Sequence, residues 1–137
     1  MSDTNPKTLM DFVQAARARI KEIDSDALER MLEEKNDLLL LDVREPSEHE
    51  HGHLQGAHLV PRGILEAAAD LQFPKHDPVL AGAREQPVVV YCATGGRSAM
   101  AAEVLQMMGF QEVYSLAGGF MNWAKDQRPV VREASYV

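Results

Sequence analysis

Residues 87–98, PVVVYCATGGRS, constrain the fold of this chain more than any other segment. The β-branched run at 88–90 is typical of a buried strand. Two glycines follow, and apolar residues at helical spacing then run from about Ser98 to Gly109, where the helix is expected to end. The segment therefore predicts a strand, a tight loop and a helix in direct succession.

Cys92, the only cysteine of the chain, opens this loop, and four residues separate it from Arg97. Such a loop can turn several backbone N–H groups inward, and the positive end of the following helix adds to them. A cysteine held there beside an arginine is expected to have a lowered pKa and to be an exposed thiolate near neutral pH. The alternative is a small buried apolar residue. The glycines, Arg97 and the helix start favour a nucleophile in an anion-binding cradle.

Three segments, in the same order along the chain, resemble the rhodanese (sulfurtransferase) family. The loop CATGGRS resembles the family's Cys-x-x-Gly-x-Arg-Ser active-site loop. Residues 40–63, LLDVREPSEHEHGHLQGAHLVPRG, resemble its Asp-Val-Arg-Glu-Pro and Gly-His-x-x-Gly-Ala segments. Residues 116–123, LAGGFMNW, resemble its closing Gly-Gly-x-x-x-Trp. The resemblance implies a single rhodanese-like α/β domain over residues 23–130, with Cys92 as the catalytic residue.

Outside this domain we expect an N-terminal extension at 1–22 with an amphipathic helix, and a C-terminal tail at 131–137. The extension helix, residues 7–20, is expected to pack on its own domain rather than on a partner. Its apolar side chains at helical spacing are Leu9, Phe12, Val13, Ala16 and Ile20.

Helices and strands alternate along the rest of the chain. Further helices are predicted at 26–34 (with Leu28 and Leu32 inward), 47–51, 63–70 and from about Phe120. Further strands are predicted at 38–41, 59–60 and 113–116, and a loop at 73–86. This alternation predicts a central parallel sheet with helices on both faces. Sites in such sheets lie beyond the carboxyl ends of the strands, where Asp42, Cys92 and the turn at Gly118 are expected to converge.

The candidate substrate-binding residues are Ala93, Thr94, Gly95, Gly96, Arg97, Ser98, Asp42 and Arg62. Asp42 has two interpretations: a residue that accepts hydrogen bonds from the Cys92 loop, or a structural ion pair at a strand end. For Arg44 we favour the structural ion pair. Arg62 is either an anion-binding residue at the rim of the pocket or a solvated side chain. Trp123 is expected in the core.

Three histidines, His49, His51 and His53, invite a metal-binding interpretation. Alternate spacing across a helix end does not put three rings on one side, and zinc-type ligand pairs are absent from the sequence. We therefore predict no metal site. The resemblance implies a structural role for His53 in a turn.

The composition of the chain restricts the classes of partner and the location that we expect. The net charge of −7 argues against nucleic acid or an anionic membrane. One cysteine excludes an internal disulfide, no apolar run approaches a membrane span, and the first residues lack a signal-peptide pattern. We expect a cytoplasmic protein, monomeric or homodimeric, without a cofactor.

The leading hypothesis is a sulfurtransferase in which Cys92 takes a sulfane sulfur from thiosulfate or a persulfide. The acceptor must come from outside, because no second cysteine exists: cyanide, a small thiol or a sulfur-carrier protein. A cysteine-dependent phosphatase is a weaker alternative, since the phosphatases that resemble this fold need one more residue between cysteine and arginine. A binding or sulfur-relay module without free turnover is the third.

Overall fold

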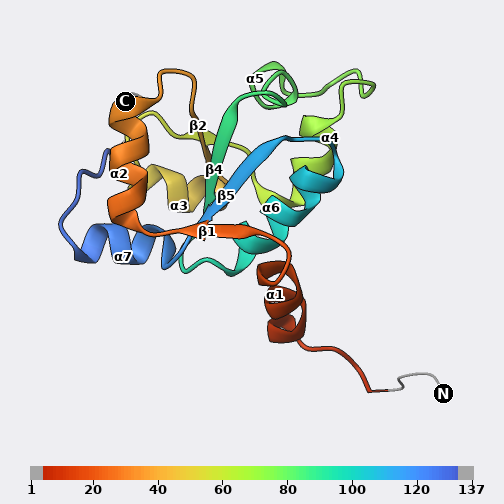
Figure 1. Ribbon diagram of the computed structural model, residues 1–137, viewed down its shortest axis with the longest axis horizontal. Helices are drawn as coiled ribbons and strands as arrows, with labels where there is room; N and C mark the ends of the chain where they lie inside the picture. The colour runs from red at the N-terminus through yellow and green to blue at the C-terminus, as the bar shows by residue number, and fades with distance from the viewer. Residues whose placement is uncertain (1–4, 133–137) are drawn as a thin grey trace.

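A computed structural model describes residues 5–132 (Figure 1). Five parallel strands form one sheet in the order β1-β5-β4-β2-β3. The strands are β1 (Lys21–Ile23), β2 (Leu39–Asp42), β3 (His58–Leu59), β4 (Pro87–Tyr91) and β5 (Glu112–Leu116). The predicted α/β fold with a parallel sheet is confirmed. No helix in this part of the chain is long and apolar enough to cross a membrane.

Helices cover both faces of the sheet. They are α1 (Leu9–Arg17), α2 (Ser25–Glu34), α3 (Pro46–Glu50), α4 (Leu65–Ala69), α5 (Pro78–Ala81), α6 (Gly96–Met107) and α7 (Gly119–Lys125), with a 3-10 turn at Arg62–Ile64. Helices α4, α5 and α6 pack in the core of one face, and α2 and α7 in that of the other. Helix α1 packs against the outside of α6 (Figure 1).

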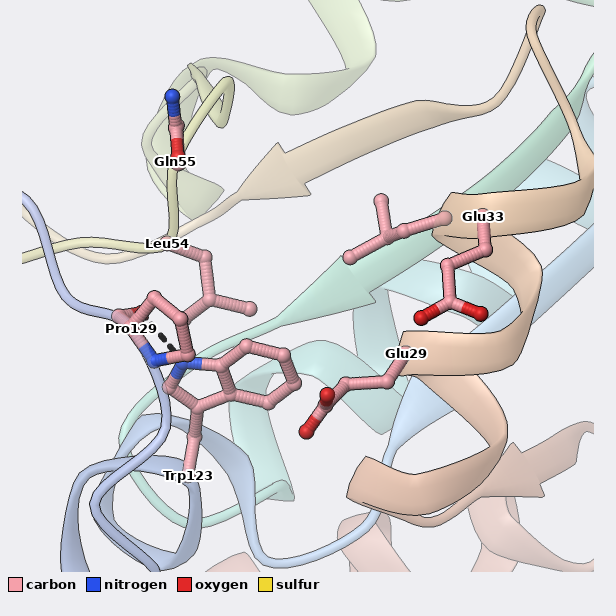
Figure 2. Close-up of a pocket in the computed structure, with 7 residues that line it drawn as sticks. Glu29, Glu33, Leu54, Gln55, Trp123 and Pro129 are labelled. Carbon is pink, nitrogen blue, oxygen red and sulfur yellow. Dashed lines mark hydrogen bonds between the residues drawn. The ribbon is translucent and has the colours of Figure 1, made fainter.

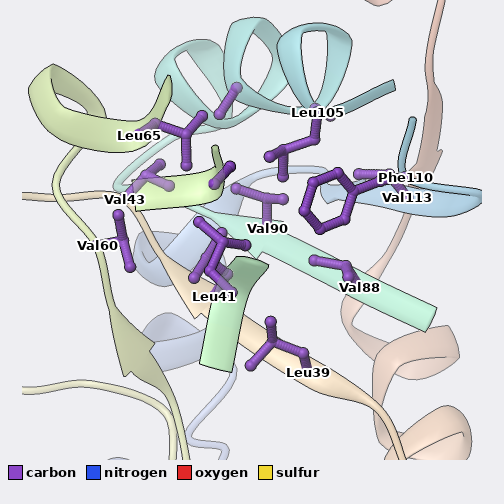
Figure 3. Close-up of a cluster of buried hydrophobic side chains, with 14 of the residues drawn as sticks. Leu39, Leu41, Val43, Val60, Leu65, Val88, Val90, Leu105, Phe110 and Val113 are labelled. Carbon is purple, nitrogen blue, oxygen red and sulfur yellow. The ribbon is translucent and has the colours of Figure 1, made fainter. Parts of the chain in front are cut away.

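Strand β4 lies in the middle of the sheet and is buried throughout, as its β-branched run predicts. Its side chains alternate between the two cores: Val88 and Val90 face α6, while Val89 and Tyr91 face α2 and α7. Figure 3 shows the first of these cores, with Val90 beside Leu105 of α6 and Val88 further along β4. Burial of each of these aliphatic side chains stabilises the folded state by about 1.5–3 kcal/mol, so β4 holds the residues at its end in fixed positions.

Several sequence predictions were wrong in detail. Strand β1 and helix α5 were missed because three and four residues carry too little pattern. Leu32 was expected inward but is 40% exposed. Leu9 and Phe12 were expected on the packed face of α1, yet they are 67% and 54% exposed. Only Val13 and Ala16 of this helix are buried, so its packed face is narrower than its apolar pattern.

The predicted convergence at the carboxyl ends of the strands is present. The first turn of α7 packs against the Cys92 loop, since the amide of Phe120 donates to Cys92 O at 2.8 Å and that of Met121 to Ala93 O at 3.0 Å. Gly119, the first residue of this turn, has a φ of +57°, and a Cβ there would lie 2.5 Å from Cys92 O. A glycine is therefore required for the turn to approach the loop.

We predict that Gly119→Ala destabilises the protein strongly. The left-handed backbone alone costs a non-glycine residue about 1–2 kcal/mol, and overlap with the Cys92 and Ala93 carbonyls adds to this. Gly63→Ala is the matched control, because a Cβ there meets open space. Denaturant unfolding should show a large loss for Gly119→Ala and a change within about 1 kcal/mol for Gly63→Ala. Equal losses would contradict the close approach.

Candidate active site

Cys92 follows β4 directly, and the loop 93–95 closes over its sulfur before α6 begins at Gly96. The backbone amide of Gly95 donates to Cys92 Sγ at 3.1 Å, and that of Ser98 at 3.4 Å. The Ser98 hydroxyl oxygen lies 3.6 Å from the same sulfur. Gly95 has a φ of +113°, a conformation that favours glycine, and as the N-cap of α6 it directs the chain from the loop into this helix. The predicted cradle of inward N–H groups is thus formed.

The pKa of the Cys92 thiol is lower than that of an ordinary cysteine. Burial raises the pKa, but hydrogen bonds from the Ser98 hydroxyl and from the amides of Ser98, Gly95 and Thr94 lower it by more. Residue Cys92 is only 1% exposed, so the expectation of an exposed thiolate was wrong. The sulfur sits at the base of the loop and depends on the loop for its stabilisation.

Ser98 is fixed in the first turn of α6 by two further contacts. While Cys92 is a thiol, the Ser98 hydroxyl donates to Gly95 O at 3.2 Å, and when Cys92 ionises the same single proton is available to the sulfur. The hydroxyl oxygen also lies 2.8 Å from the hydroxyl of Ser115 on β5. Both serines are fully buried. Ser115 was not predicted from the sequence. It ties the Cys92 loop to the neighbouring strand through Ser98.

The Arg97 guanidinium binds a carboxylate on α3, and its charge also interacts with that of Cys92. The guanidinium makes two parallel hydrogen bonds to Glu48 of α3, at 2.8 and 3.0 Å. This contact lowers the pKa of Glu48 to about 2, so the carboxylate stays charged at every pH of interest. Arg97 therefore braces the loop against α3, which fits the predicted structural part of its role. Glu48 was missed, because no local pattern marks a partner 49 positions away.

Asp42 is fully buried in a polar network at the end of β2. It accepts hydrogen bonds from Arg44 (Nη2, 2.8 Å), His49 (Nδ1, 2.9 Å) and Tyr91 (hydroxyl, 3.1 Å). Burial raises the pKa of Asp42, but the bonds from Arg44 and His49 lower it by more. Within residues 5–132, no hydrogen bond joins Asp42 to the loop 93–98. The geometry thus favours the structural interpretation of both Asp42 and Arg44.

Arg62 lies in the 3-10 turn after β3, at the same edge of the sheet. Its backbone amide donates to Val43 O at 3.0 Å, while its guanidinium contacts Glu66 of α4 at 3.0 Å. The side chain is 27% exposed. The structure therefore places Arg62 near the end of β2 and joins its charge to α4 rather than to the Cys92 loop.

The three histidines have other contacts. His49 and His53 are buried and stack with ring centroids 3.7 Å apart. The Nδ1 of His49 is bonded to Asp42, and that of His53 to the backbone oxygen of His49. His51 is exposed and contacts Ser47 O. In residues 5–132, no group of three or more potential ligands is placed to hold a metal ion.

A separate hollow of about 300 Å³ opens between α2 and the residues around Trp123 (Figure 2). Trp123 is 3% exposed, as predicted, and its indole N–H donates to Pro129 O at 2.7 Å. Leu32, Leu54 and two carboxylates, Glu29 and Glu33, line the rest with Gln55. None of these residues belongs to the Cys92 loop.

The fold and the loop define an α/β protein with a buried, activated cysteine at the carboxyl end of its central strand. The model of the rhodanese-like domain family matches residues 24–126. The chain therefore belongs to the rhodanese-like domain family.

Two similar proteins are named sulfurtransferases. A sulfurtransferase of Allochromatium vinosum is 32% identical over 112 residues, which are 82% of this chain and 95% of that protein. The thiosulfate sulfurtransferase GlpE of Vibrio cholerae is 33% identical over 79% of this chain and 92% of its own. A solved structure from Rhodopseudomonas palustris, of unknown function and described as a possible tyrosine phosphatase, has a TM-score of 0.84 and 31% identity, and covers 96% of this chain and 99% of its own. Together with the family match, the named relatives support a general sulfurtransferase activity.

We predict that the Ser98 hydroxyl lowers the pKa of Cys92 more than Arg97 does. Ser98→Ala should raise the pKa and slow Cys92 alkylation at neutral pH by roughly ten-fold, because a hydrogen bond to a charged group contributes about 1.5–3 kcal/mol. Arg97→Ala should shift the pH profile of alkylation less. Ser115→Ala is the control that keeps the sulfur contact. A larger shift for Arg97→Ala than for Ser98→Ala would show that charge, not the loop hydrogen bonds, stabilises the thiolate.

Proposed function

We propose that this protein is a thiosulfate sulfurtransferase that carries the transferred sulfur as a persulfide on Cys92. The observation that carries the proposal is the buried Cys92 sulfur, which accepts two backbone N–H groups from a short loop. These donors are fixed by the fold and need no rearrangement when negative charge develops on sulfur. The named sulfurtransferase relatives support the same class of reaction.

The first half-reaction is a displacement at sulfur. The Cys92 thiolate attacks the outer sulfur of thiosulfate, a new S–S bond forms, and the S–S bond of the donor breaks. Sulfite leaves with the electron pair of that bond, and Cys92 becomes a persulfide anion. The amides of Gly95 and Ser98, which donate to Cys92 Sγ, and that of Thr94 would stabilise the negative charge of the persulfide. Ala93 and Gly96 complete the loop that encloses it.

The second half-reaction returns the enzyme to its starting state. A nucleophile attacks the outer sulfur of the persulfide, takes it, and leaves the Cys92 thiolate behind. Cys92 is the only cysteine in the sequence, so no second cysteine of this chain can take the sulfur. The acceptor is therefore external: cyanide, a small thiol or a sulfur-carrier protein. An acidic chain with one unpaired cysteine suits a reducing compartment, and we propose the cytoplasm.

The phosphatase alternative has less support. The description of the R. palustris structure raises it, and the buried cysteine loop is shared by both chemistries. Four residues separate Cys92 from Arg97, one fewer than the phosphatases with this kind of fold use. The two terminal nitrogens of Arg97 are also both bonded to Glu48. A cradle of this size fits a single sulfur atom better than a phosphate with its oxygens.

We predict that the protein converts thiosulfate and cyanide to sulfite and thiocyanate with ping-pong kinetics. Double-reciprocal plots at several cyanide concentrations should be parallel, because sulfite leaves before cyanide binds. Cys92→Ser should abolish turnover and keep the fold, since serine is similar in volume. Aryl phosphates should be hydrolysed negligibly by the same sample.

Two results would contradict this assignment. Thiocyanate formation by Cys92→Ser at the wild-type rate would remove Cys92 from the reaction. Robust, Cys92-dependent hydrolysis of aryl phosphate without thiocyanate formation would favour the phosphatase. Uptake of sulfur from thiosulfate without release to any small acceptor would instead favour a sulfur-relay module.

A further inference from the structure

Helix α1 lies outside the segment that matches the family, residues 24–126. It nevertheless packs against α6, the helix that follows the Cys92 loop. Figure 1 shows α1 projecting from the body of the domain on the side where α6 begins. Its buried residue Val13 lies against the first residue of α6, because a Cβ on Gly96 would be 3.4 Å from Val13 Cγ2. The N-terminal extension therefore forms one wall beside the candidate active site.

Arg17 follows Val13 by one helical turn and lies on the same side of α1. A Cβ on Gly95 would lie 3.4 Å from Arg17 Nη2, so the guanidinium rests directly against the backbone of Gly95. The amide of this same residue donates to Cys92 Sγ at 3.1 Å. One residue of the loop thus separates the Arg17 cation from the nucleophile.

The guanidinium of Arg17 is paired less closely with a carboxylate than those of the two other arginines considered for this site. Arg97 makes two hydrogen bonds to Glu48, and Arg62 is paired with Glu66. Among the residues that the structure describes, Arg17 has a single ion pair, of 3.4 Å between its Nε and Glu22, and its side chain is 38% exposed. Its Nη2 side faces Gly95, so a cation faces the loop in a protein with a net charge of −7.

We propose that Arg17 of the N-terminal helix is a further positioning residue, which attracts and orients the anionic sulfur donor at the Cys92 loop. The role rests on the proposed sulfurtransferase function. Thiosulfate carries two negative charges, so a cation beside the loop favours its approach and has much less effect on an uncharged reagent. The helix that carries Arg17 is held against α6 by its buried residue Val13, which lies beside Gly96.

The test compares two alkylating reagents of nearly the same size on Cys92. Iodoacetate is an anion and iodoacetamide is neutral, so the ratio of their rates measures the local potential without any sulfur transfer. Arg17→Ala should lower the ratio by about 3- to 10-fold at low ionic strength, and less at high salt. Arg17→Lys should retain most of it. Arg19→Ala is the matched control, since this neighbouring arginine is paired with Glu103, and it should leave the ratio unchanged.

Steady-state kinetics with thiosulfate give the second reading. Arg17→Ala should raise KM for thiosulfate by a similar factor and change kcat little, because Arg17 binds the donor rather than the reacting sulfur. Helix α1 should persist in this variant, since alanine is the best helix former, and far-ultraviolet circular dichroism checks this.

The outcomes separate the two proposals. An iodoacetate-to-iodoacetamide ratio in Arg17→Ala equal to wild type overturns the role of Arg17, whether or not the protein transfers sulfur. Equal slowing of both reagents overturns it as well, because that pattern belongs to a structural role. Wild-type protein without thiosulfate turnover, but with the expected change of ratio, rejects thiosulfate as the donor and retains Arg17 as the residue that attracts an anion to Cys92.

Discussion

The contacts on which the rest of the site depends are the backbone N–H groups aimed at Cys92 Sγ. They stabilise a thiolate in a position that is otherwise buried and unfavourable for charge. Their direction requires a left-handed Gly95, a helix that begins at Gly96, and the close approach of Gly119 beneath the loop. Because backbone groups make the cradle, its geometry is set by the fold and not by a flexible side chain.

The polar network around Asp42 supports this cradle from the neighbouring strand. Tyr91, the last residue of β4, donates its hydroxyl to Asp42 and accepts the amide of Leu54 at 3.1 Å. The ends of β2 and β4, which carry Asp42 and Cys92, are therefore joined by buried hydrogen bonds as well as by the sheet. Arg97 and Glu48 add a second brace from α3. The loop is thus held on several sides before any substrate binds.

The sequence predicted the parts of the fold that are written in local patterns. The β-branched run of β4, the glycines of the loop and the apolar face of α6 each span enough residues to indicate their structure, and the family resemblance linked them. Strand β1 and helix α5 are too short to show a pattern. The Arg97–Glu48 and Arg17–Gly95 contacts join residues far apart in the chain, so only tertiary packing reveals them. The burial of Cys92 is also a result of tertiary packing, since the folded loop closes over it, and local sequence does not reveal it.

The central claim is that Cys92 itself carries the transferred sulfur, and intact mass spectrometry tests it most directly. Purified, reduced protein is incubated with thiosulfate under non-reducing conditions, desalted and weighed, and then treated with cyanide. We expect a gain of one sulfur atom's mass that cyanide removes, and no gain for Cys92→Ser. An unchanged mass for the wild-type protein while it forms thiocyanate, or the same gain in Cys92→Ser, would show that Cys92 does not carry the sulfur.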